Sequence, residues 1–111
     1  MKRIMFLLTA IALASAPAFA ADKKIERTWK SKCSSCHGKT GQADTEKGKK
    51  MKMKDMTTAE WQKITDAEIK KVLKEGVKEE KDGVKKEMDA YDDLKPEQVD
   101  GLIAFMRGLK K

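Results

Sequence analysis

Apolar residues recur along this chain with the spacing of an α-helix in three segments. In residues 23–33 they fall four positions apart, at Ile25, Trp29 and Cys33. Residues 66–75 follow an i, i+3, i+4 pattern, and residues 96–109 begin with proline, which suits the first turn of a helix. The spacing predicts three amphipathic helices. The apolar positions of the two later ones are Ile69, Val72, Leu73, Val99, Leu102, Ile103 and Met106, with Phe105 widening the last face.

Threonine and glutamate residues indicate two further features before the last segment. Thr57 with Glu60, and Thr65 with Glu68, have the spacing of a capping box, which satisfies free backbone N–H groups at a helix start. They predict a short helix near residues 59–63 and the start of the longer one at Asp66. The segment between the two later helices is polar and contains glycine, and no stretch alternates long enough to favour a strand. We therefore expect an all-α fold.

The first twenty residues differ from the rest of the chain. Lys2 and Arg3 precede an apolar run over residues 4–14, and the segment ends Ala18-Phe19-Ala20. A basic start, a short apolar middle and small residues at the exit are typical of a secretory signal, so we expect cleavage after Ala20. The apolar run is too short to span a bilayer as a stable helix. The expected mature protein is a single domain, residues 21–111, without a membrane span.

Composition narrows the possible functions. Charged residues make up 39% of the chain, and its net charge of +7 falls to +5 when Lys2 and Arg3 leave with the signal. Only about a third of residues 21–111 are apolar, so we expect a bound group to complete the core. One histidine and two cysteines are too few for a structural zinc site. The positive charge does not indicate nucleic-acid binding, because we expect the chain to be exported and it has no basic helix motif.

The candidate chemistry lies in Cys33-Ser34-Ser35-Cys36-His37. Two thiols three positions apart, followed at once by an imidazole, are the signature of c-type haem attachment. On one helical turn both thiols lie on the same face and can each form a thioether to a haem vinyl group, while His37 presents a neutral nitrogen to the iron. A thiol redox pair and a small disulfide are weaker alternatives, because the chain shows no βαβ pattern and a bridge over two residues is strained.

The iron needs a sixth ligand or keeps an open position, and the chain has no second histidine. Methionine sulfur is an available ligand. Met106 falls on the apolar stripe of the last helix. Met51, Met53 and Met56 lie in a lysine-rich stretch, where apolar filling of a loop explains them better. Met88 lies in the polar segment between two helices, where it is not part of the apolar face of any predicted helix. It is therefore the preferred ligand.

On these residues the chain resembles the class I, monohaem cytochromes c of the bacterial periplasm. The resemblance covers essentially the whole mature chain, and it is carried by Trp29, the Cys33–His37 motif with Gly38, Met88-Asp89-Ala90-Tyr91 and the final segment Leu102–Leu109. It implies three to five helices wrapped around one covalently bound haem c, with the first and last helices crossing. It also implies the site residues: Cys33 and Cys36 as thioether links, His37 and Met88 as axial ligands, and Trp29 and Phe105 as aromatics packed near the haem.

The chain departs from the family at two positions. The family usually has proline directly after the ligand methionine, where this chain has Asp89. It also often has a proline in the loop after the haem motif, whose carbonyl holds the histidine. The only prolines here are Pro17 and Pro96, so the acceptor for His37 is unassigned.

The resemblance implies a soluble periplasmic electron carrier that is not an enzyme, and we expect a monomer. Lysines crowd at residues 47–54, 70–74 and 85–86. They form either an ordinary solvated surface or a positive rim that steers redox partner proteins with acidic docking surfaces. Three alternatives remain open. They are a haem enzyme or gas sensor with an open sixth position, a cytochrome subunit of a larger redox complex, and a thiol–disulfide protein without haem.

Overall fold

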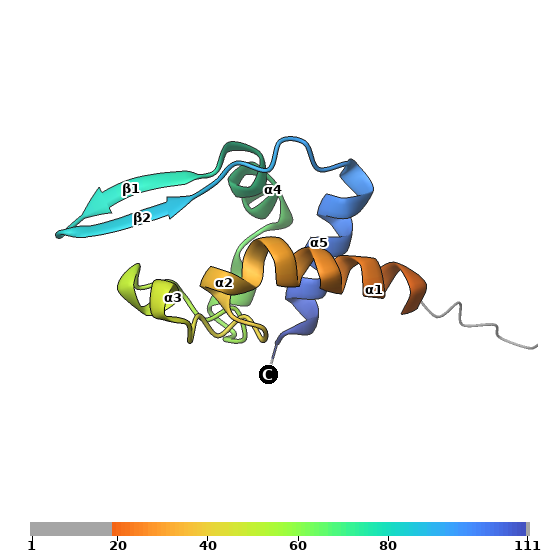
Figure 1. Cartoon of the computed structure of the whole chain (residues 1–111), viewed down its shortest axis with the longest axis horizontal. Helices are drawn as coiled ribbons and strands as arrows, with labels where there is room; N and C mark the ends of the chain where they lie inside the picture. The colour runs from red at the N-terminus through yellow and green to blue at the C-terminus, as the bar shows by residue number, and fades with distance from the viewer. Residues whose placement is uncertain (1–18, 111) are drawn as a thin grey trace, which may run out of the picture.

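The computed structural model describes residues 19–110 (Figure 1). The helix α1 (Phe19–Thr28) continues through a π-helical turn, η1 (Trp29–Cys33), into α2 (Ser34–His37). There follow α3 (Glu46–Lys50), the 3-10 turn η2 (Trp61–Lys63), α4 (Asp66–Glu75), the strands β1 (Val77–Lys81) and β2 (Val84–Met88), and α5 (Pro96–Gly108). Residues 1–18 lie outside the described part, so the expected signal segment is not tested. Within residues 19–110, none of the helices is long and apolar enough to cross a membrane.

The three predicted amphipathic helices are present. The first is longer than expected, because α1 begins at Phe19 and the helical path runs on to His37. The helix α4 has the predicted bounds: the Thr65 side chain accepts a hydrogen bond from the Glu68 N–H at 3.2 Å, as an N-cap does. Near residues 59–63 the chain forms only the short turn η2, and the hydroxyl that accepts the Trp61 N–H belongs to Thr58 instead of Thr57.

The first and last helices pack against each other, as the resemblance implies. Figure 1 shows α1 lying across α5, and the two elements are in direct contact. Trp29, on the turn η1 directly after α1, and Leu102, on α5, are the most deeply buried large side chains of the described residues, each 1% exposed. The rest of the core surrounds them: Ile25, Cys33, Met56, Trp61, Ile69, Leu73, Ile103 and Met106.

The expectation of an all-α fold is wrong. Residues 77–88, which the sequence pattern assigned to a loop, form an antiparallel hairpin of β1 and β2. The turn between the strands has positive φ at Asp82 (53°) and Gly83 (77°), as a two-residue type I′ turn requires. Opposite charges face each other across the strands in three successive pairs: Lys78 with Glu87, Glu79 with Lys86, and Glu80 with Lys85.

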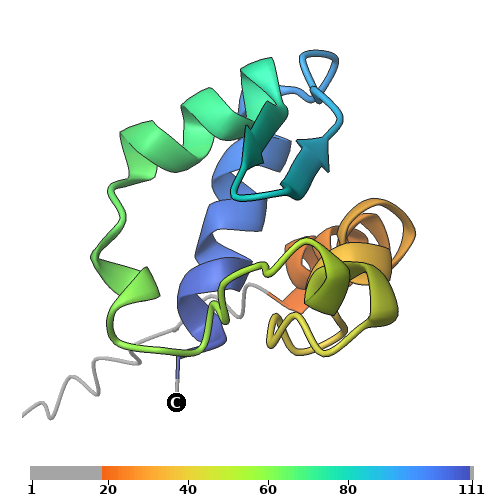
Figure 2. The same ribbon diagram turned by 90° about the vertical axis from the view of Figure 1, so that its left-hand side faces the viewer.

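The hairpin projects from the helices and hides little apolar surface. Apart from Val77 at one end, the side chains of β1 are exposed, and β2 alternates between partly buried and exposed positions. This explains the failed expectation, because a strand that buries almost nothing lacks the apolar alternation by which strands are recognised. In Figure 2, α4, the hairpin and the α2–α3 region are arranged around α5. Met88, at the end of β2, packs against the core.

Candidate functional site

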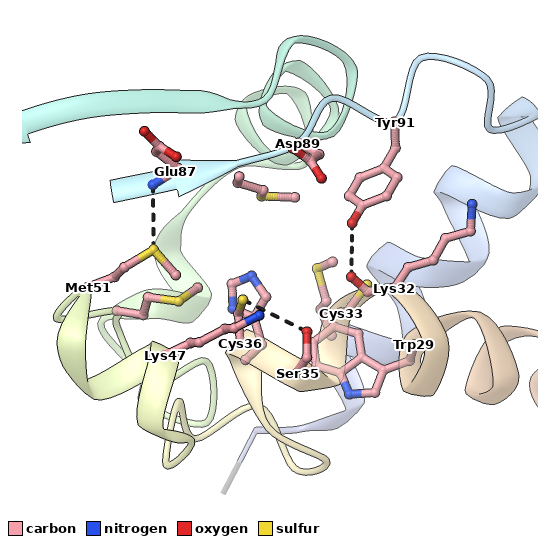
Figure 3. Close-up of a pocket in the computed structure, with 14 residues that line it drawn as sticks. Trp29, Lys32, Cys33, Ser35, Cys36, Lys47, Met51, Glu87, Asp89 and Tyr91 are labelled. Carbon is pink, nitrogen blue, oxygen red and sulfur yellow. Dashed lines mark hydrogen bonds between the residues drawn. The ribbon is translucent and has the colours of Figure 1, made fainter. Parts of the chain in front are cut away.

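The five residues of the haem motif lie on the turn where η1 passes into α2. Cys33 is buried, Cys36 and His37 are partly buried, and both cysteines are free thiols. All three side chains line one cavity of about 350 Å³, shown in Figure 3. The structure therefore brings the three residues of the motif to a single hollow.

Trp29 contacts this turn through a hydrogen bond and through its ring. Its indole Nε1–H donates a hydrogen bond to the Gly38 carbonyl at 3.0 Å, directly after His37. Its ring centroid lies 5.9 Å from that of His37 and 5.0 Å from that of Phe105. Trp29 lines the cavity, whereas Phe105 stands behind Trp29 and is not among the lining residues. Both aromatics thus lie near the motif, with Phe105 supporting it through Trp29.

A second set of contacts with the motif comes from the start of α3 and was not predicted from the sequence. The Thr45 hydroxyl donates a hydrogen bond to the Cys36 carbonyl at 2.6 Å and accepts one from the Gly48 N–H at 2.9 Å. Gly48 is buried so closely that a Cβ there would lie 2.6 Å from the Cys36 carbonyl oxygen and 2.7 Å from that of Ala43. The available signal was Thr45 directly before a glutamate and a lysine-rich turn, which is the composition of an N-capped helix start.

The opposite wall of the cavity comes from β2 and the segment after it. Glu87, Met88, Asp89 and Tyr91 line the hollow from this side, as Figure 3 shows for the three of them that it labels. His37 and Met88 also line two further cavities together, of about 190 and 240 Å³. The motif histidine and the candidate ligand methionine therefore face the same internal space, although 51 positions separate them in the sequence.

The other methionines are divided between this space and the core. Met51 and Met53 line two of the three cavities, as filler for a loop beside a bound ring would. Met56 and Met106 are buried members of the core cluster and line the third cavity from the helical side. All five methionines among residues 19–110 therefore lie within or next to one region of the structure.

Burial sets the protonation states of the motif. It lowers the pKa of His37 to about 4, so the ring is neutral at pH 7, the form that binds a metal. Burial also raises the pKa of Cys33 to about 11, outweighing the opposite effect of Lys32. Burial, followed by the nearby Cys33, Asp89 and Cys36, raises the pKa of Tyr91, whose hydroxyl stays a donor.

These residues fit a haem c group. Two free thiols, a neutral imidazole and a thioether line one cavity, the imidazole and the thioether also line two more, and the walls carry aromatic and methionine side chains. The His37 Nδ1 atom is buried, and no residue of the described chain hydrogen-bonds to it, so the protein does not engage that nitrogen. The acceptor that the sequence left unassigned is thus not supplied within residues 19–110.

Positive side chains lie around the openings of these cavities. Lys32 and Lys47 line the largest one, and Lys54 and Lys86 line the smallest. Glu87 lines both cavities and Asp89 also lines the first, so lysines and carboxylates balance there, whereas lysine is in excess at the smallest cavity.

Comparisons with known proteins agree with this site. The family model described as "Cytochrome C oxidase, cbb3-type, subunit III" matches residues 20–106. The solved structure of the KustC0563 c-type cytochrome is 30% identical, with a TM-score of 0.63, and the match covers 78% of this chain and 96% of that one. No curated protein matches the chain. The chain belongs to the cytochrome c family that this model describes, and is a small monohaem c-type cytochrome with a domain of the kind that transfers electrons through haem.

Proposed function

We propose that this protein is an exported one-electron carrier in which His37 and Met88 are the two axial ligands of one haem c. The observation that carries the proposal is that both residues line the same three cavities, one from the haem motif and the other from the end of β2. Cys33 and Cys36, which line the largest of these three cavities, are the residues that would hold the haem through thioether bonds.

Each of these residues contributes a definite property. The bound haem supplies a metal centre that gains and loses a single electron. The Met88 thioether is a soft ligand and favours the reduced state, and so does the apolar wall of Trp29 and Met106, because burying net charge is unfavourable. His37 binds as the neutral imidazole that its lowered pKa provides.

A protein ligand on each face leaves no position for a substrate, which supports a carrier over an enzyme or a gas sensor. An open sixth position would require Met88 to lie away from the space that His37 faces. Met88 instead lies partly buried on that space and packs against the core. We therefore propose that the protein is not an enzyme.

The lysines at the openings support a preference for partner proteins with acidic docking surfaces. Lys47 and Lys54 are exposed and belong to the same stretch of chain as α3, beside the openings. Opposite charges at such a rim raise the rate of encounter between two proteins. We propose brief complexes of this kind, formed by a monomeric carrier.

Proteins of the c type are typically exported, which agrees with the expected signal in residues 1–20. We propose that the mature chain begins at Ala21 and works in the periplasm. Determination of the N-terminal sequence of the haem-containing protein tests this directly. A chain that still begins at Met1 would contradict export by cleavage.

A second candidate function has one observation in its favour. The matching family model is described as a subunit of a cbb3-type oxidase, so a role as a subunit of a larger redox complex is the alternative to a free carrier. Size-exclusion chromatography of a mildly prepared periplasmic extract, followed by haem staining, separates the two. A free carrier elutes at the size of the mature chain, whereas a subunit elutes with a larger assembly.

The proposed ligation is tested by two matched substitutions. Met88→Leu and Met53→Leu each remove one sulfur from the lining of the same two cavities and keep the apolar volume. Met88→Leu should lose the far-red sulfur-to-ferric-iron absorption band, and its reduced form should bind carbon monoxide. Met53→Leu should keep the band and exclude carbon monoxide. The proposal fails if Met88→Leu keeps the band.

A further inference from the structure

Two hydrogen bonds tie the segment that carries Met88 to the opposite wall of the cavity. The Glu87 N–H donates to the Met51 Sδ atom at 3.5 Å, and the Tyr91 hydroxyl donates to the Lys32 carbonyl at 2.9 Å. One bond starts one residue before Met88 and the other three residues after it. Figure 3 shows both as dashed lines that cross from the β2 side to the motif side.

We propose that Met51 and Tyr91 are positioning residues that together clamp Met88 opposite His37. This inference rests on the proposed His37 and Met88 ligation. It adds to that proposal a mechanism by which the protein keeps the sulfur in place, with no contact between the clamping side chains and the iron.

The need for a clamp follows from how little else holds the hairpin. The strands β1 and β2 pack mainly against each other, and most of their side chains are exposed. A two-stranded hairpin is only marginally stable by itself. Met88 is its last residue, so without ties to the rest of the chain it would move with the hairpin ends.

The acceptors of both hydrogen bonds are held close to residues of the haem motif. Lys32 directly precedes Cys33 on η1. Met51 directly follows α3, which is fixed to the Cys36 carbonyl through the Thr45 hydroxyl and the tight approach of Gly48. The two hydrogen bonds therefore connect the Met88 segment to the backbone beside Cys33 and to the helix that is fixed to Cys36. Both cysteines belong to the same motif as His37.

Three further contacts anchor Tyr91 and hold its hydroxyl in place as a donor. Its backbone N–H donates to the Leu73 carbonyl at 2.7 Å, and the Lys32 ammonium lies 5.5 Å from the centre of its ring. The ring also packs against the core cluster. Tyr91 thus joins three elements: α4, η1 and the end of the Met88 segment.

The rate at which cyanide binds to the ferric protein measures the clamp, because cyanide can bind only when the Met88 sulfur has left. Loss of the Tyr91 hydroxyl in Tyr91→Phe should accelerate cyanide binding by about three- to tenfold, the effect of one hydrogen bond. Met51→Leu should accelerate it by about two- to threefold, because a thioether is a weak acceptor. The double variant should react faster than either single one.

Each variant has a matched control in the same part of the molecule. Met53→Leu removes a sulfur from the same loop and the same cavity, and no hydrogen bond from β2 is seen at it among the described residues. Ser31→Ala removes a hydroxyl that donates to the Thr28 carbonyl at 3.2 Å on the same helical path as Lys32. Both controls should bind cyanide at the rate of the unmodified protein, and all variants should keep the far-red band at rest.

Failure of the clamp and failure of the ligation give different results. If the unmodified protein shows the far-red band but Met51→Leu and Tyr91→Phe bind cyanide no faster than their controls, the clamp is overturned and the ligation stands. If the unmodified protein lacks the band, the ligation is wrong and the clamp falls with it. The clamp is supported if cyanide binds faster to Met51→Leu and Tyr91→Phe and binds to both controls at the rate of the unmodified protein.

Discussion

The indole of Trp29 and the carbonyl of Gly38 form a hydrogen bond of 3.0 Å that closes a loop around the haem motif. Trp29 lies four residues before Cys33, and Gly38 directly follows His37. The bond therefore fixes the start and the end of the motif relative to each other, while the buried ring of Trp29 fills the space between α5 and the motif. The contact therefore holds the backbone directly after His37.

Replacement of Trp29 by phenylalanine should destabilise the haem-containing protein by about 2–4 kcal/mol, because it leaves the Gly38 carbonyl without its donor and opens a void. Trp61→Phe is a control with the same change in volume at another buried tryptophan. Unfolding in guanidinium should show a loss at least about 1 kcal/mol larger for Trp29→Phe than for Trp61→Phe. Equal losses would mean that the hydrogen bond has no role of its own.

Alanine at Gly48 should destabilise the protein by about 1–3 kcal/mol, although alanine usually favours a helix over glycine. The added Cβ would lie within 2.7 Å of two backbone carbonyl oxygens, which cannot move aside as a flexible side chain can. Gly108→Ala is the control, because it is also helical and a Cβ there meets nothing within 4 Å. Thermal unfolding should give a lower Tm for Gly48→Ala and an unchanged or higher one for Gly108→Ala.

Acid should destabilise the protein through His37. Its pKa is about 4 in the folded chain and 6.5 at its ordinary value, so the unfolded chain binds more protons between these limits. The free energy of unfolding should therefore fall as the pH drops from 6.5 to 4, by up to about 3 kcal/mol, and iron bound to the ring acts in the same direction. The chain has no other histidine that could titrate in this range. Denaturant midpoints that rise as the pH falls would contradict the assignment.

Charge reversal at the rim should change electron exchange with small ions. Lys47→Glu with Lys54→Glu should slow oxidation of the ferrous protein by the ferricyanide anion by about tenfold at low salt, and should accelerate reduction of the ferric protein by the hexaammineruthenium(II) cation. Lys23→Glu with Lys24→Glu makes the same change in net charge on α1, outside the cavity linings. Stopped-flow traces should show the smaller effect in this second pair. Equal effects in both pairs would show that net charge, not the rim, governs the rate.

Much of the helical framework could be predicted from the sequence. The bounds of α4 follow from the Thr65 cap and the apolar spacing of Ile69 and Leu73, and α5 begins at Pro96 as its geometry requires. The haem motif was visible because its chemistry needs particular residues at a fixed local spacing. Local signals of this kind do not depend on the rest of the fold.

The hairpin, and the contacts that Thr45, Gly48 and Tyr91 make with distant carbonyl groups, were not predicted for a different reason. The strands pair through their backbones, and oppositely charged residues such as Lys78 with Glu87, or Glu80 with Lys85, look like solvated loop residues until their register is known. Only Asp82-Gly83 carried a strand signal. Thr45, Gly48 and Tyr91 act on carbonyl groups that are 9, 12 and 59 positions away, at distances that no local pattern encodes.

Absorption spectra of the purified protein test the central claim most directly, in the ferric form, in the ferrous form, and in the ferrous form with carbon monoxide. Ligation by His37 and Met88 predicts sharp low-spin bands, a weak far-red band in the ferric form, and no change on addition of carbon monoxide. A high-spin spectrum that shifts with carbon monoxide would contradict the account, because it would mean that the Met88 sulfur does not occupy the sixth position.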